Sequence, residues 1–381
     1  MTWIALMPVL TWIYLLFGRG MFWRLSERDD RNEPSTSPQV WPSVVAIVPA
    51  RDEADVIADT LESLLRQDYP GALRIVLVDD QSSDGTGETA LAKARALGGE
   101  ERMHIVSGRS RPQGWTGKVW AMQQGMEHAL QLDPPDYVLF TDADIVHAPD
   151  NLRHLVARAE AGRLVLVSLM AKLYCRSFAE KLLIPAFVFF FDMLFPFAWA
   201  NDPRRRTAAA AGGCMLARRE ALLAAGGIEA IKTEIIDDCA LARIMKRQGP
   251  IWLGLTERAA SVRPYGDLNE IRRMIARSAY AQLDYSPLLL AGTILGMVLV
   301  YAAAPLFTLF GTGIVRLEGA ATWAAMTLAF QPMLRFYRLS PLWGLALPAI
   351  GGLYTVFTID SALQFWRGKG GMWKGRAQAM A

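Results

Sequence analysis

Four short and almost wholly apolar runs alternate with helix-like segments across residues 43–141. The runs are 43–49 (SVVAIVP), 73–78 (LRIVLV), 104–107 (HIVS) and 137–141 (YVLFT). Unbroken apolar runs of this length are typical of parallel strands that are buried on both faces. The intervening segments have the length and spacing of covering helices, which we expect at 54–67, after residue 86, and at 118–130. This alternation predicts an α/β fold built on a doubly wound sheet.

Apolar segments outside that region indicate contact with a membrane. Hydrophobic residues make up 52% of the chain and charged residues only 20%, which is a low charge content for a soluble enzyme of 381 residues. Residues 3–17 are apolar and uncharged, and four arginines follow closely: Arg19, Arg24, Arg28 and Arg31. Basic residues after the run, with none before it, predict an anchor over 1–23 with its N-terminus outside, rather than a cleaved signal peptide. A buried helix is the alternative.

The C-terminal region 286–366 is also predicted to be membrane-embedded. Residues 287–311 and 341–365 are long enough to span a bilayer, whereas the apolar stretch 320–334 is shorter and contains a glutamine and a proline. The basic tail, 367–381, is predicted to be cytoplasmic. Because the catalytic residues are expected on the same side, the number of C-terminal spans must be even. We therefore assign 320–334 as interfacial or re-entrant.

Residues 43–285 form the predicted catalytic domain, and a polar linker over 24–42 joins it to the anchor. Within this domain, the strongly apolar stretch 182–200 is interrupted by Pro185, Asp192 and Pro196. We expect two broken helices in the membrane interface there, because the catalytic residues before and after the stretch must share one side. The whole pattern predicts a multi-pass protein of a bacterial inner (plasma) membrane, with its catalytic domain in the cytoplasm.

Charge and cysteine content exclude several other classes. The net charge of +3 is too small to indicate a nucleic-acid partner. The three cysteines are odd in number and lack metal-ligand spacing, so neither a disulfide framework nor a zinc site is predicted. Four scattered histidines give no zinc pattern either.

Acidic residues recur at four places, three of them directly after predicted strands. They are Asp52 and Glu53 after Arg51, the pair Asp79 and Asp80, the pair Asp142 and Asp144, and the pair Asp237 and Asp238. Carboxylates at such positions are costly to desolvate unless they meet a cation, a metal ion or hydrogen-bond donors. Ligands of doubly wound sheets bind at the carboxyl ends of the strands. These acids are therefore candidate ligand-binding residues.

Asp142 and Asp144 are separated by one small residue beyond the strand 137–141, so in extended backbone they share a face. Two carboxylates with the other ligand positions open suit Mg²⁺ or Mn²⁺ bridging a diphosphate. A cap or turn uses aspartate in the same way, but the position after a buried strand favours the metal.

Asp79 and Asp80 end the second strand and could accept hydrogen bonds from a nucleotide base or ribose. A turn with a helix N-cap is the simpler interpretation, and it explains Asp84 better than it explains the two acids before it. Lys118, in the loop 114–118 (GWTGK), can pair with a phosphate, although a capped loop fits that segment equally well.

Asp238 is the candidate general base, with Asp237 beside it. Both precede a helical stretch at 239–248, where two acids would also favour the helix dipole. As a base, Asp238 would take a proton from an acceptor hydroxyl. The glycine pair 212–213 would allow the acceptor or the sugar to pass close to the backbone.

In this order, the acidic motifs resemble the family 2 glycosyltransferases with a GT-A fold. The matching pieces cover roughly residues 43–260 and are VPARDE (48–53), VDDQSSDGT (78–86), GWTGK (114–118), TDADI (141–145), AGGCMLARRE (211–220) and IIDDCALARIMKRQG (235–249). Further segments, including IPAFVFFF and RFYRLSPLW, look like the bacterial glycosyltransferases associated with hopanoid biosynthesis. The ceramide glucosyltransferase type is a neighbouring relative.

The resemblance implies roles for individual residues. Asp80 with Asp79 would hold the base and ribose, Asp142 and Asp144 would bind the metal–diphosphate, and Asp238 would be the base of an inverting displacement. Pocket-lining roles would fall to Arg51, Asp52, Glu53 and Lys118. The sequence departs from the Q/R-x-x-R-W motif of processive and ceramide-type members, because no tryptophan follows the arginine in RRMIARS (272–278). Arg273 and Arg277 could still contact the diphosphate.

Together these features predict a hexosyltransferase that moves a sugar from a nucleotide sugar, expected to be a UDP-sugar, to a lipid acceptor. A soluble acceptor would give no reason for the broken apolar stretch 182–200. The alternatives are a ceramide-glucosyltransferase-like glycolipid synthase, a polysaccharide synthase, which would need more spans, and a membrane scaffold with a degenerate transferase fold. A nucleotidyltransferase has no evident use for Asp237 and Asp238.

Overall fold

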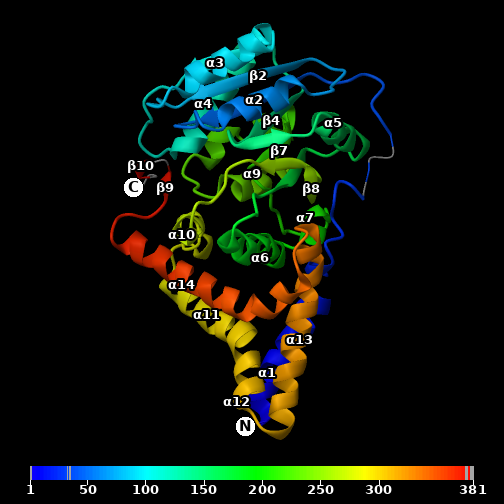
Figure 1. The fold of residues 1–381 in the computed structure, drawn as a ribbon. Helices are drawn as coiled ribbons and strands as arrows, with labels where there is room; N and C mark the ends of the chain where they lie inside the picture. Colours follow the sequence, from blue (N-terminus) through cyan, green and yellow to red (C-terminus); the bar gives the residue numbers. More distant parts are fainter. Residues whose placement is uncertain (1, 32, 34–35, 374–375, 378–381) are drawn as a thin grey trace. The chain divides into compact units, whose positions relative to one another are not determined.

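The computed structural model of the protein describes residues 2–31, 33, 36–373 and 376–377 (Figure 1). The chain forms two compact units and passes between them several times. The helical unit comprises Met1–Ser26, Cys175–Ala198 and Pro264–Gly371, and the α/β unit comprises Glu27–Tyr174, Trp199–Arg263 and Met372–Ala381. Residues 175–198 and 264–285, which the sequence prediction assigns to the catalytic domain, therefore group with the apolar helices. Lys374 of the predicted basic tail lies outside the described residues.

An eight-stranded mixed sheet forms the centre of the α/β unit, in the order β3-β2-β1-β4-β7-β6-β8-β5. Its strands are Val44–Ala50 (β1), Leu73–Asp79 (β2), Met103–Ser107 (β3), Tyr137–Thr141 (β4), Ile145–His147 (β5), Leu166–Lys172 (β6), Cys214–Arg218 (β7) and Ile251–Ser261 (β8). The first four strands are mutually parallel, as the sequence predicts, and each lies within one residue of its predicted bounds. The other four were not predicted. β7 is antiparallel to β4 and β6, and β5 is antiparallel to β8.

Helices cover the sheet and enclose two separate hydrophobic cores. They are Ile57–Leu65 (α2), Thr86–Ala96 (α3), Gly117–Leu132 (α4), Asn151–Ala161 (α5), Arg219–Ala224 (α8) and Asp237–Met245 (α9). Alternate residues of β1 face different cores, because successive strand side chains point to opposite faces. Ala46 and Val48 pack in the core that contains Leu61 of α2, whereas Ile47 packs with Met122 of α4. Helices on both faces are what a doubly wound sheet requires.

Short helical turns and one small sheet complete the α/β unit. The turns are Glu100–Arg102 (η3) and Ile228–Ile231 (η4), and the two-stranded sheet pairs Met372–Trp373 (β9) with Arg376–Ala377 (β10).

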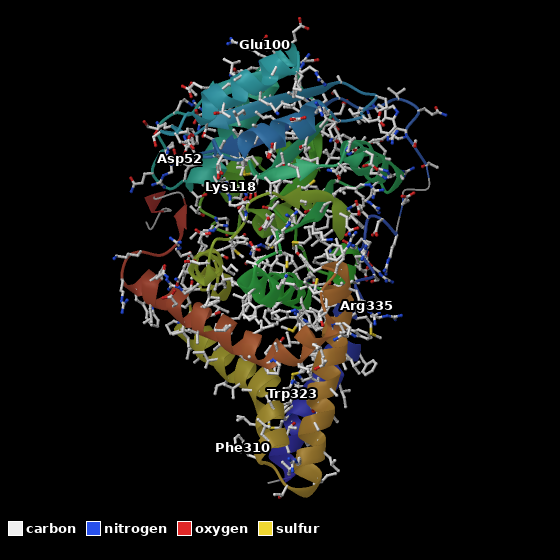
Figure 2. All side chains as sticks on the ribbon, viewed as in Figure 1. Asp52, Glu100, Lys118, Phe310, Trp323 and Arg335 are labelled. Carbon is white, nitrogen blue, oxygen red and sulfur yellow. The ribbon has the colours of Figure 1, made fainter. Side chains whose placement is uncertain are left out.

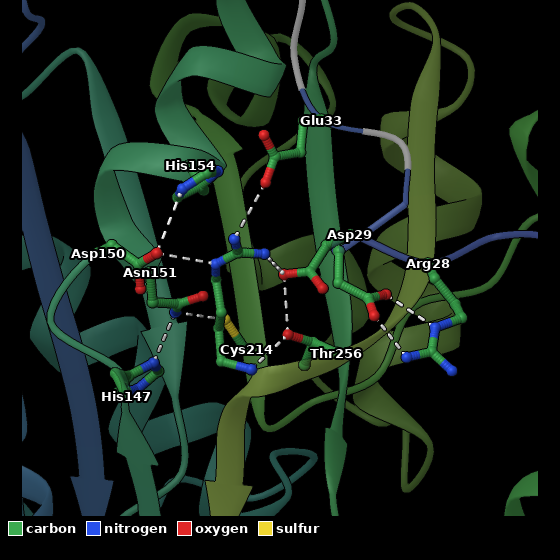
Figure 3. A network of polar contacts seen from close by, with 11 residues as sticks. Arg28, Asp29, Glu33, His147, Asp150, Asn151, His154, Cys214 and Thr256 are labelled. Atoms are coloured by element: carbon green, nitrogen blue, oxygen red, sulfur yellow. Dashed lines mark hydrogen bonds and ion pairs between the residues drawn. The ribbon is translucent and has the colours of Figure 1, made fainter. Parts of the chain in front are cut away.

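The predicted linker, residues 24–42, is partly built into this sheet. The amide of Leu255 donates to the Glu27 carbonyl (2.9 Å), and the amide of Asp29 donates to the Leu255 carbonyl (3.0 Å). The buried Asp29 carboxylate accepts a hydrogen bond from Thr256 (2.8 Å) and lies 3.2 Å from Arg258, which also pairs with Asp150 (Figure 3). Residues 27–29 therefore act as an additional edge of the sheet rather than as a free linker.

The helical unit contains long apolar helices and short amphipathic ones. Its elements are Thr2–Ile13 (α1), Tyr14–Gly18 (η1), Phe22–Arg24 (η2), Phe178–Leu194 (α6), Leu268–Ala276 (α10), Ala281–Leu283 (η5), Pro287–Met297 (α11), Val298–Ala302 (η6), Ala303–Phe310 (α12), Gly313–Phe336 (α13), Pro341–Ala346 (η7) and Leu347–Trp366 (α14). The short helix Phe197–Asn201 (α7) follows α6. α1, α12 and α13 lie side by side (Figure 1), and the Trp12 indole donates to the Val300 carbonyl (2.8 Å).

Within the part of the chain that the structure describes, two helical stretches are long and apolar enough to cross a membrane, Pro287–Phe310 and Pro341–Trp366. They coincide with the two segments predicted from sequence. The N-terminal stretch Ala5–Gly18 is apolar but shorter. Large apolar side chains such as Leu288 and Phe310 are exposed on the helical unit, and Figure 2 shows Phe310 beside the turn between α12 and α13.

Two predictions about the apolar segments need correction. Pro185 and Asp192 do not interrupt the stretch 182–200, because both lie inside the continuous helix α6. The helix ends only before Pro196, where the Asp192 carboxylate accepts a hydrogen bond from the amide of Phe197 (3.0 Å). The predicted short segment 320–334 is part of the 24-residue helix α13. A proline removes one helical hydrogen bond, and tertiary packing outweighs that loss in both helices.

Candidate functional site

The loops after β1 and β2 form one polar surface, because the two strands pair in parallel with Ala50 opposite Asp79. The Arg51 guanidinium donates to the Asp80 carbonyl (2.5 Å) and lies 3.7 Å from the Asp80 carboxylate, which is buried. The Asp52 amide donates to the hydroxyl of Ser82 (3.0 Å), and the Asp52 carboxylate accepts from the amide of Ser83 (2.8 Å). The first two predicted acidic sites therefore lie together.

Part of this surface has the simpler turn function that the sequence allows. Asp84 accepts from the amides of Thr86 (3.0 Å) and Ala54 (2.9 Å), and Asp79 accepts from the amide of Ser82 (2.9 Å). Asp52 adopts a left-handed backbone, with φ of 50°. That conformation costs a non-glycine residue on the order of 1 kcal/mol. The hydrogen bonds of Asp52 with Ser82 and Ser83 offset this cost.

Lys118 connects the third acidic pair with the fourth. It lies in the first turn of α4, and its ammonium is 2.9 Å from the Asp142 carboxylate and 3.2 Å from that of Asp237. Burial raises the pKa of Asp142, and the neighbouring carboxylates of Asp144 and Asp237 add to this rise against the opposing effect of Lys118. Burial by itself would lower the pKa of Lys118, but the attraction of Asp142 and Asp237 outweighs it and raises that pKa. The start of α9 and the end of β4 therefore converge on the one ammonium group that α4 supplies.

Asp238 has a different environment from Asp237, although the two residues are adjacent. One Asp238 oxygen accepts from the Gly212 amide (3.0 Å) and the other from the Cys239 amide (2.7 Å). Burial raises the pKa of Asp238 to about 6, and the Asp237 carboxylate adds to the rise. A carboxylate with this pKa can exchange protons near neutral pH, which a general base requires.

Gly212 brings the backbone close to this cluster. A Cβ atom at that position would lie 3.1 Å from the Lys118 ammonium and 3.5 Å from an Asp238 oxygen. The antiparallel pairing of Thr141 with Cys214 brings the glycine pair beside the end of β4, and the Thr141 hydroxyl donates to the Gly213 carbonyl (2.8 Å). The unpredicted strand β7 therefore places Gly212 next to the predicted base.

Sequence reasoning missed two residues at the end of β8. The Ser261 hydroxyl donates to the Asp144 carboxylate (2.9 Å), and Arg263 pairs with Glu53, Asp55 and Asp144. The antiparallel pairing of Ile145 with Ser261 brings them there. No local motif marks them, because their role depends on a strand pairing that spans more than one hundred residues.

Arg273 and Arg277 belong to the helical unit, at the end of α10, where both are exposed. Their predicted contact with a diphosphate stays a prediction. The other predicted site residues all lie in the α/β unit, where the contacts above link them into one surface.

Metal binding at Asp142 and Asp144 would depend on ligands from outside the protein. Among the described residues, no group of three or more His, Cys, Asp or Glu side chains is arranged to hold a metal ion. The two carboxylates are nevertheless close enough for Asp144 to raise the pKa of Asp142. Their oxygen donors suit Mg²⁺ or Mn²⁺ when a diphosphate and water complete the coordination. The residues therefore fit a metal ion that is bound together with its nucleotide.

Comparison with known proteins identifies the class of the α/β unit. Residues 45–224 match the family described as "Glycosyl transferase family 2". The chain therefore contains a family 2 glycosyltransferase domain, as its motifs predict, and this domain has the GT-A type of α/β fold with a mixed sheet.

Individual relatives agree with this class. The chain is 31% identical to the "Uncharacterized glycosyltransferase YaiP" of Escherichia coli (strain K12) over 155 residues, which is 40% of this chain and 34% of that protein. It is 30% identical to an N-acetylglucosaminyltransferase of Mesorhizobium japonicum over 128 residues, which is 33% of this chain and 27% of that protein. The chain thus spans about a third or less of the length of the curated relatives it matches.

The fold also resembles a solved structure, the mannosyltransferase PcManGT from Pyrobaculum calidifontis in complex with GDP-Man and Mn²⁺. The TM-score is 0.53 at 20% identity, and the match covers 96% of this chain and 99% of that one. At this identity the likeness establishes the fold alone.

Proposed function

We propose that the protein is a membrane-bound inverting glycosyltransferase that transfers a sugar from a nucleotide sugar, a UDP-sugar, to the hydroxyl of a lipid. The observation that carries this proposal is the environment of Asp238, a carboxylate with a pKa of about 6 beside Gly212 and the Lys118 cluster. A family 2 glycosyltransferase domain supplies the reaction class.

In the proposed reaction, Asp238 accepts the proton of the acceptor hydroxyl while the oxygen attacks the anomeric carbon of the sugar. A single displacement inverts that carbon, and the nucleoside diphosphate departs with the electron pair of the broken bond. The amides of Gly212 and Cys239 orient the Asp238 carboxylate. Positioned general-base catalysis of this kind contributes roughly 10²–10⁴-fold to a rate.

The donor would bind along the ends of β1, β2 and β4. Asp80, held by Arg51, would take the base and ribose, and Lys118 would leave its carboxylate partners to pair with the diphosphate. A divalent ion held by Asp142 and Asp144 would neutralise negative charge on the departing phosphates. Mn²⁺ accompanies GDP-Man in the Pyrobaculum mannosyltransferase, whose fold this chain resembles.

The helical unit supports a membrane location and suggests its topology. The α/β unit receives the chain at residues 27, 199 and 372 and releases it at 174 and 263, so these junctions share one side of the membrane. In the proposed topology, α1 enters from outside, α11–α12 leaves, and α13 returns antiparallel to α12 after a turn at Gly311.

This topology keeps the predicted even number of C-terminal spans but assigns them differently from the sequence. The 24 residues of α13 extend about 36 Å, enough for a hydrocarbon core of about 30 Å. α14 would lie at the cytoplasmic face, where its polar residue Asp360 pairs with Arg272 of α10. Gly313→Cys should add labelling by an impermeant reagent from outside the cell beyond that of the unmodified protein, which carries Cys175, Cys214 and Cys239. Added labelling only after lysis would refute this topology.

A lipid acceptor is supported by the apolar helices α6, α11 and α12, which a soluble acceptor would not require. A link to hopanoid metabolism rests on the sequence resemblance of the segments IPAFVFFF and RFYRLSPLW. The full chain, incubated with Mn²⁺, a panel of labelled UDP-sugars and host lipid extract, should produce a labelled lipid.

The decisive variant is Asp238→Asn in this assay. It should lose roughly 10²–10⁴-fold in turnover while still binding UDP, because it removes the base but retains the shape of the side chain. Its melting temperature should change little, because the removal of a buried charge offsets the loss of one of the two amide hydrogen bonds that the carboxylate accepts. Normal turnover in this variant would refute the assignment of the base. A protein with no metal-dependent UDP binding would instead be a scaffold with a degenerate transferase fold.

A further inference from the structure

Arg263 lies in the loop after β8 and meets three carboxylates, two of which, Glu53 and Asp144, belong to separate predicted sites. Its guanidinium forms a close ion pair with Glu53, lies 3.6 Å from Asp55, and approaches Asp144 through its Nε atom, also at 3.6 Å. The side chain is 29% exposed, so solvent screens these attractions only in part. One guanidinium therefore connects the loop after β1 with the second acid of the predicted metal pair.

The position of Arg263 relative to Asp144 is fixed by the sheet. β5 and β8 pair with Ile145 opposite Ser261, and the Val262 amide donates to the Asp144 carbonyl (2.9 Å). The Ser261 hydroxyl holds one Asp144 carboxylate oxygen at 2.9 Å, and Arg263 lies 3.6 Å from that same oxygen. Strand pairing thus holds the guanidinium beside a carboxylate that we propose binds a divalent cation.

We infer that Arg263 is an internal counter-ion that competes with the divalent cation for Asp144 and so sets the affinity of the protein for the metal. This inference rests on the proposed function, specifically on Asp142 and Asp144 as metal ligands. A guanidinium 3.6 Å from the carboxylate offsets the attraction of that carboxylate for a cation, and it also repels the cation directly. Metal binding therefore requires the Arg263–Asp144 contact to break, while the Ser261 hydrogen bond can remain.

The displaced guanidinium has partners on its other side. Glu53 and Asp55 both lie in the loop after β1, so Arg263 can stay bound to that loop when Asp144 takes the cation. Glu53 is itself anchored by a hydrogen bond from its amide to Thr86 (2.9 Å). Metal occupancy at Asp144 is thereby linked to the loop that is predicted to line the nucleotide pocket. By reciprocity, the metal should change the affinity for the nucleotide by the same factor by which the nucleotide changes the affinity for the metal.

The competing role falls to Arg263 rather than Lys118. Lys118 is held by two carboxylates at 2.9 and 3.2 Å and is predicted to pair with the diphosphate itself. Arg263 makes its closest ion pair with Glu53, away from the metal pair, and its Asp144 contact is the looser one. Breaking the Arg263–Asp144 contact therefore costs little interaction energy, whereas an intact contact weakens cation binding.

The test is a titration of the full-length purified protein with Mn²⁺ in the absence of nucleotide, in which electron paramagnetic resonance measures free Mn²⁺. Arg263→Gln should bind Mn²⁺ roughly three- to tenfold more tightly than the unmodified protein, because a positive charge near the ion is removed. Arg263→Lys, which keeps the charge, should stay close to the unmodified protein. Asp144→Asn should weaken Mn²⁺ binding and abolish the effect of Arg263→Gln.

Two further variants separate local competition from net charge and from misfolding. Arg66→Gln removes the same charge from an exposed helix pair with Glu62, and it should leave Mn²⁺ affinity unchanged. Glu53→Gln combined with Arg263→Gln preserves net charge and leaves no unpaired Glu53 carboxylate, yet it should still bind Mn²⁺ more tightly.

Unchanged or weaker Mn²⁺ binding in both Arg263→Gln variants would overturn the inference while leaving the proposed function intact, provided that Asp142→Asn weakens binding. If the unmodified protein bound no Mn²⁺, or if Asp142→Asn left its Mn²⁺ affinity unchanged, both the metal site of the proposed function and the role of Arg263 would be refuted.

Discussion

Charged side chains are arranged differently in the two units of the molecule. In the α/β unit, the carboxylates of Asp142, Asp237 and Asp238 gather around the single ammonium of Lys118. In the helical unit, Arg272 of α10 pairs with Asp360 of α14 at 2.6 Å, one charge for one. The first arrangement leaves excess negative charge in a partly buried place, which costs stability, while the second is balanced. Excess charge of this kind indicates a site that awaits a cationic or proton-bearing ligand.

This comparison predicts that removing an acid from the Lys118 cluster harms activity and spares stability. Asp142→Asn should lower turnover by roughly 10³-fold or more, because it removes a proposed metal ligand and a partner of Lys118. The melting temperature should stay the same or rise, since the burial that raises the pKa of Asp142 penalises its charged form. Steady-state turnover and thermal unfolding measure the two effects. A large loss of stability would show that the cluster is structural.

The second prediction concerns the close approach of backbone to the same cluster. Gly212→Ala should lower turnover by roughly 10- to 100-fold, because its Cβ would lie 3.1 Å from the Lys118 ammonium and displace it. Gly292→Ala is the matched control, since a Cβ there meets nothing within 4 Å, and its turnover should match the unmodified protein. Equal turnover in both variants would contradict the proposed role of Gly212.

The pH dependence sharpens the difference between the adjacent acids Asp237 and Asp238. A base with a pKa of about 6 is protonated in acid, so turnover should fall as the pH drops through about 6. The Asp237 charge helps to raise that pKa, and therefore Asp237→Asn should move the acid limb to lower pH. The same shift has a stability consequence. Because folding raises this pKa, the contribution of Asp238 to stability is greatest below its unfolded value near 4 and is lost as the pH rises through 6. Rate profiles from pH 4 to 9 test the first effect, and a limb that Asp237→Asn leaves unmoved would contradict it.

The smallest effect is expected in the helical unit. Asp360→Asn removes the partner of Arg272 and one acceptor of Gln364, and it should reduce the free energy of unfolding by about 1 kcal/mol, because both side chains of the ion pair are partly exposed. Turnover should change much less than in Asp142→Asn. The double variant Arg272→Gln with Asp360→Asn should lose less unfolding free energy than the sum of the two single variants, because the two residues form one ion pair. Unfolding of the detergent-solubilised protein measures this coupling. A loss of turnover as large as that of Asp142→Asn would instead place this pair in the catalytic machinery.

Local pattern predicted the elements whose signals are contained in a few residues. The buried runs before Arg51, Asp79 and Asp142 became β1, β2 and β4, because a strand that is buried on both faces must be apolar throughout. The same strands placed three of the acidic groups at one edge of the sheet. Helix continuity was less predictable. Pro185 and Pro332 suggested breaks, yet α6 and α13 continue through them because packing compensates for the missing hydrogen bonds.

The sequence by itself determined which acids would stand at strand ends and which reaction class they resemble, because both follow from short-range pattern. Only the tertiary structure decided what each acid meets. Lys118 of α4 lies between Asp142 and Asp237, and the pairing of β7 with β4 brings Gly212 to the same place. Arg263 lies beside Asp144 because β8 pairs with β5. These strand pairings are long-range and leave no local signature. The pKa of Asp238 has the same origin, since burial and neighbouring charge exist only once the chain has folded.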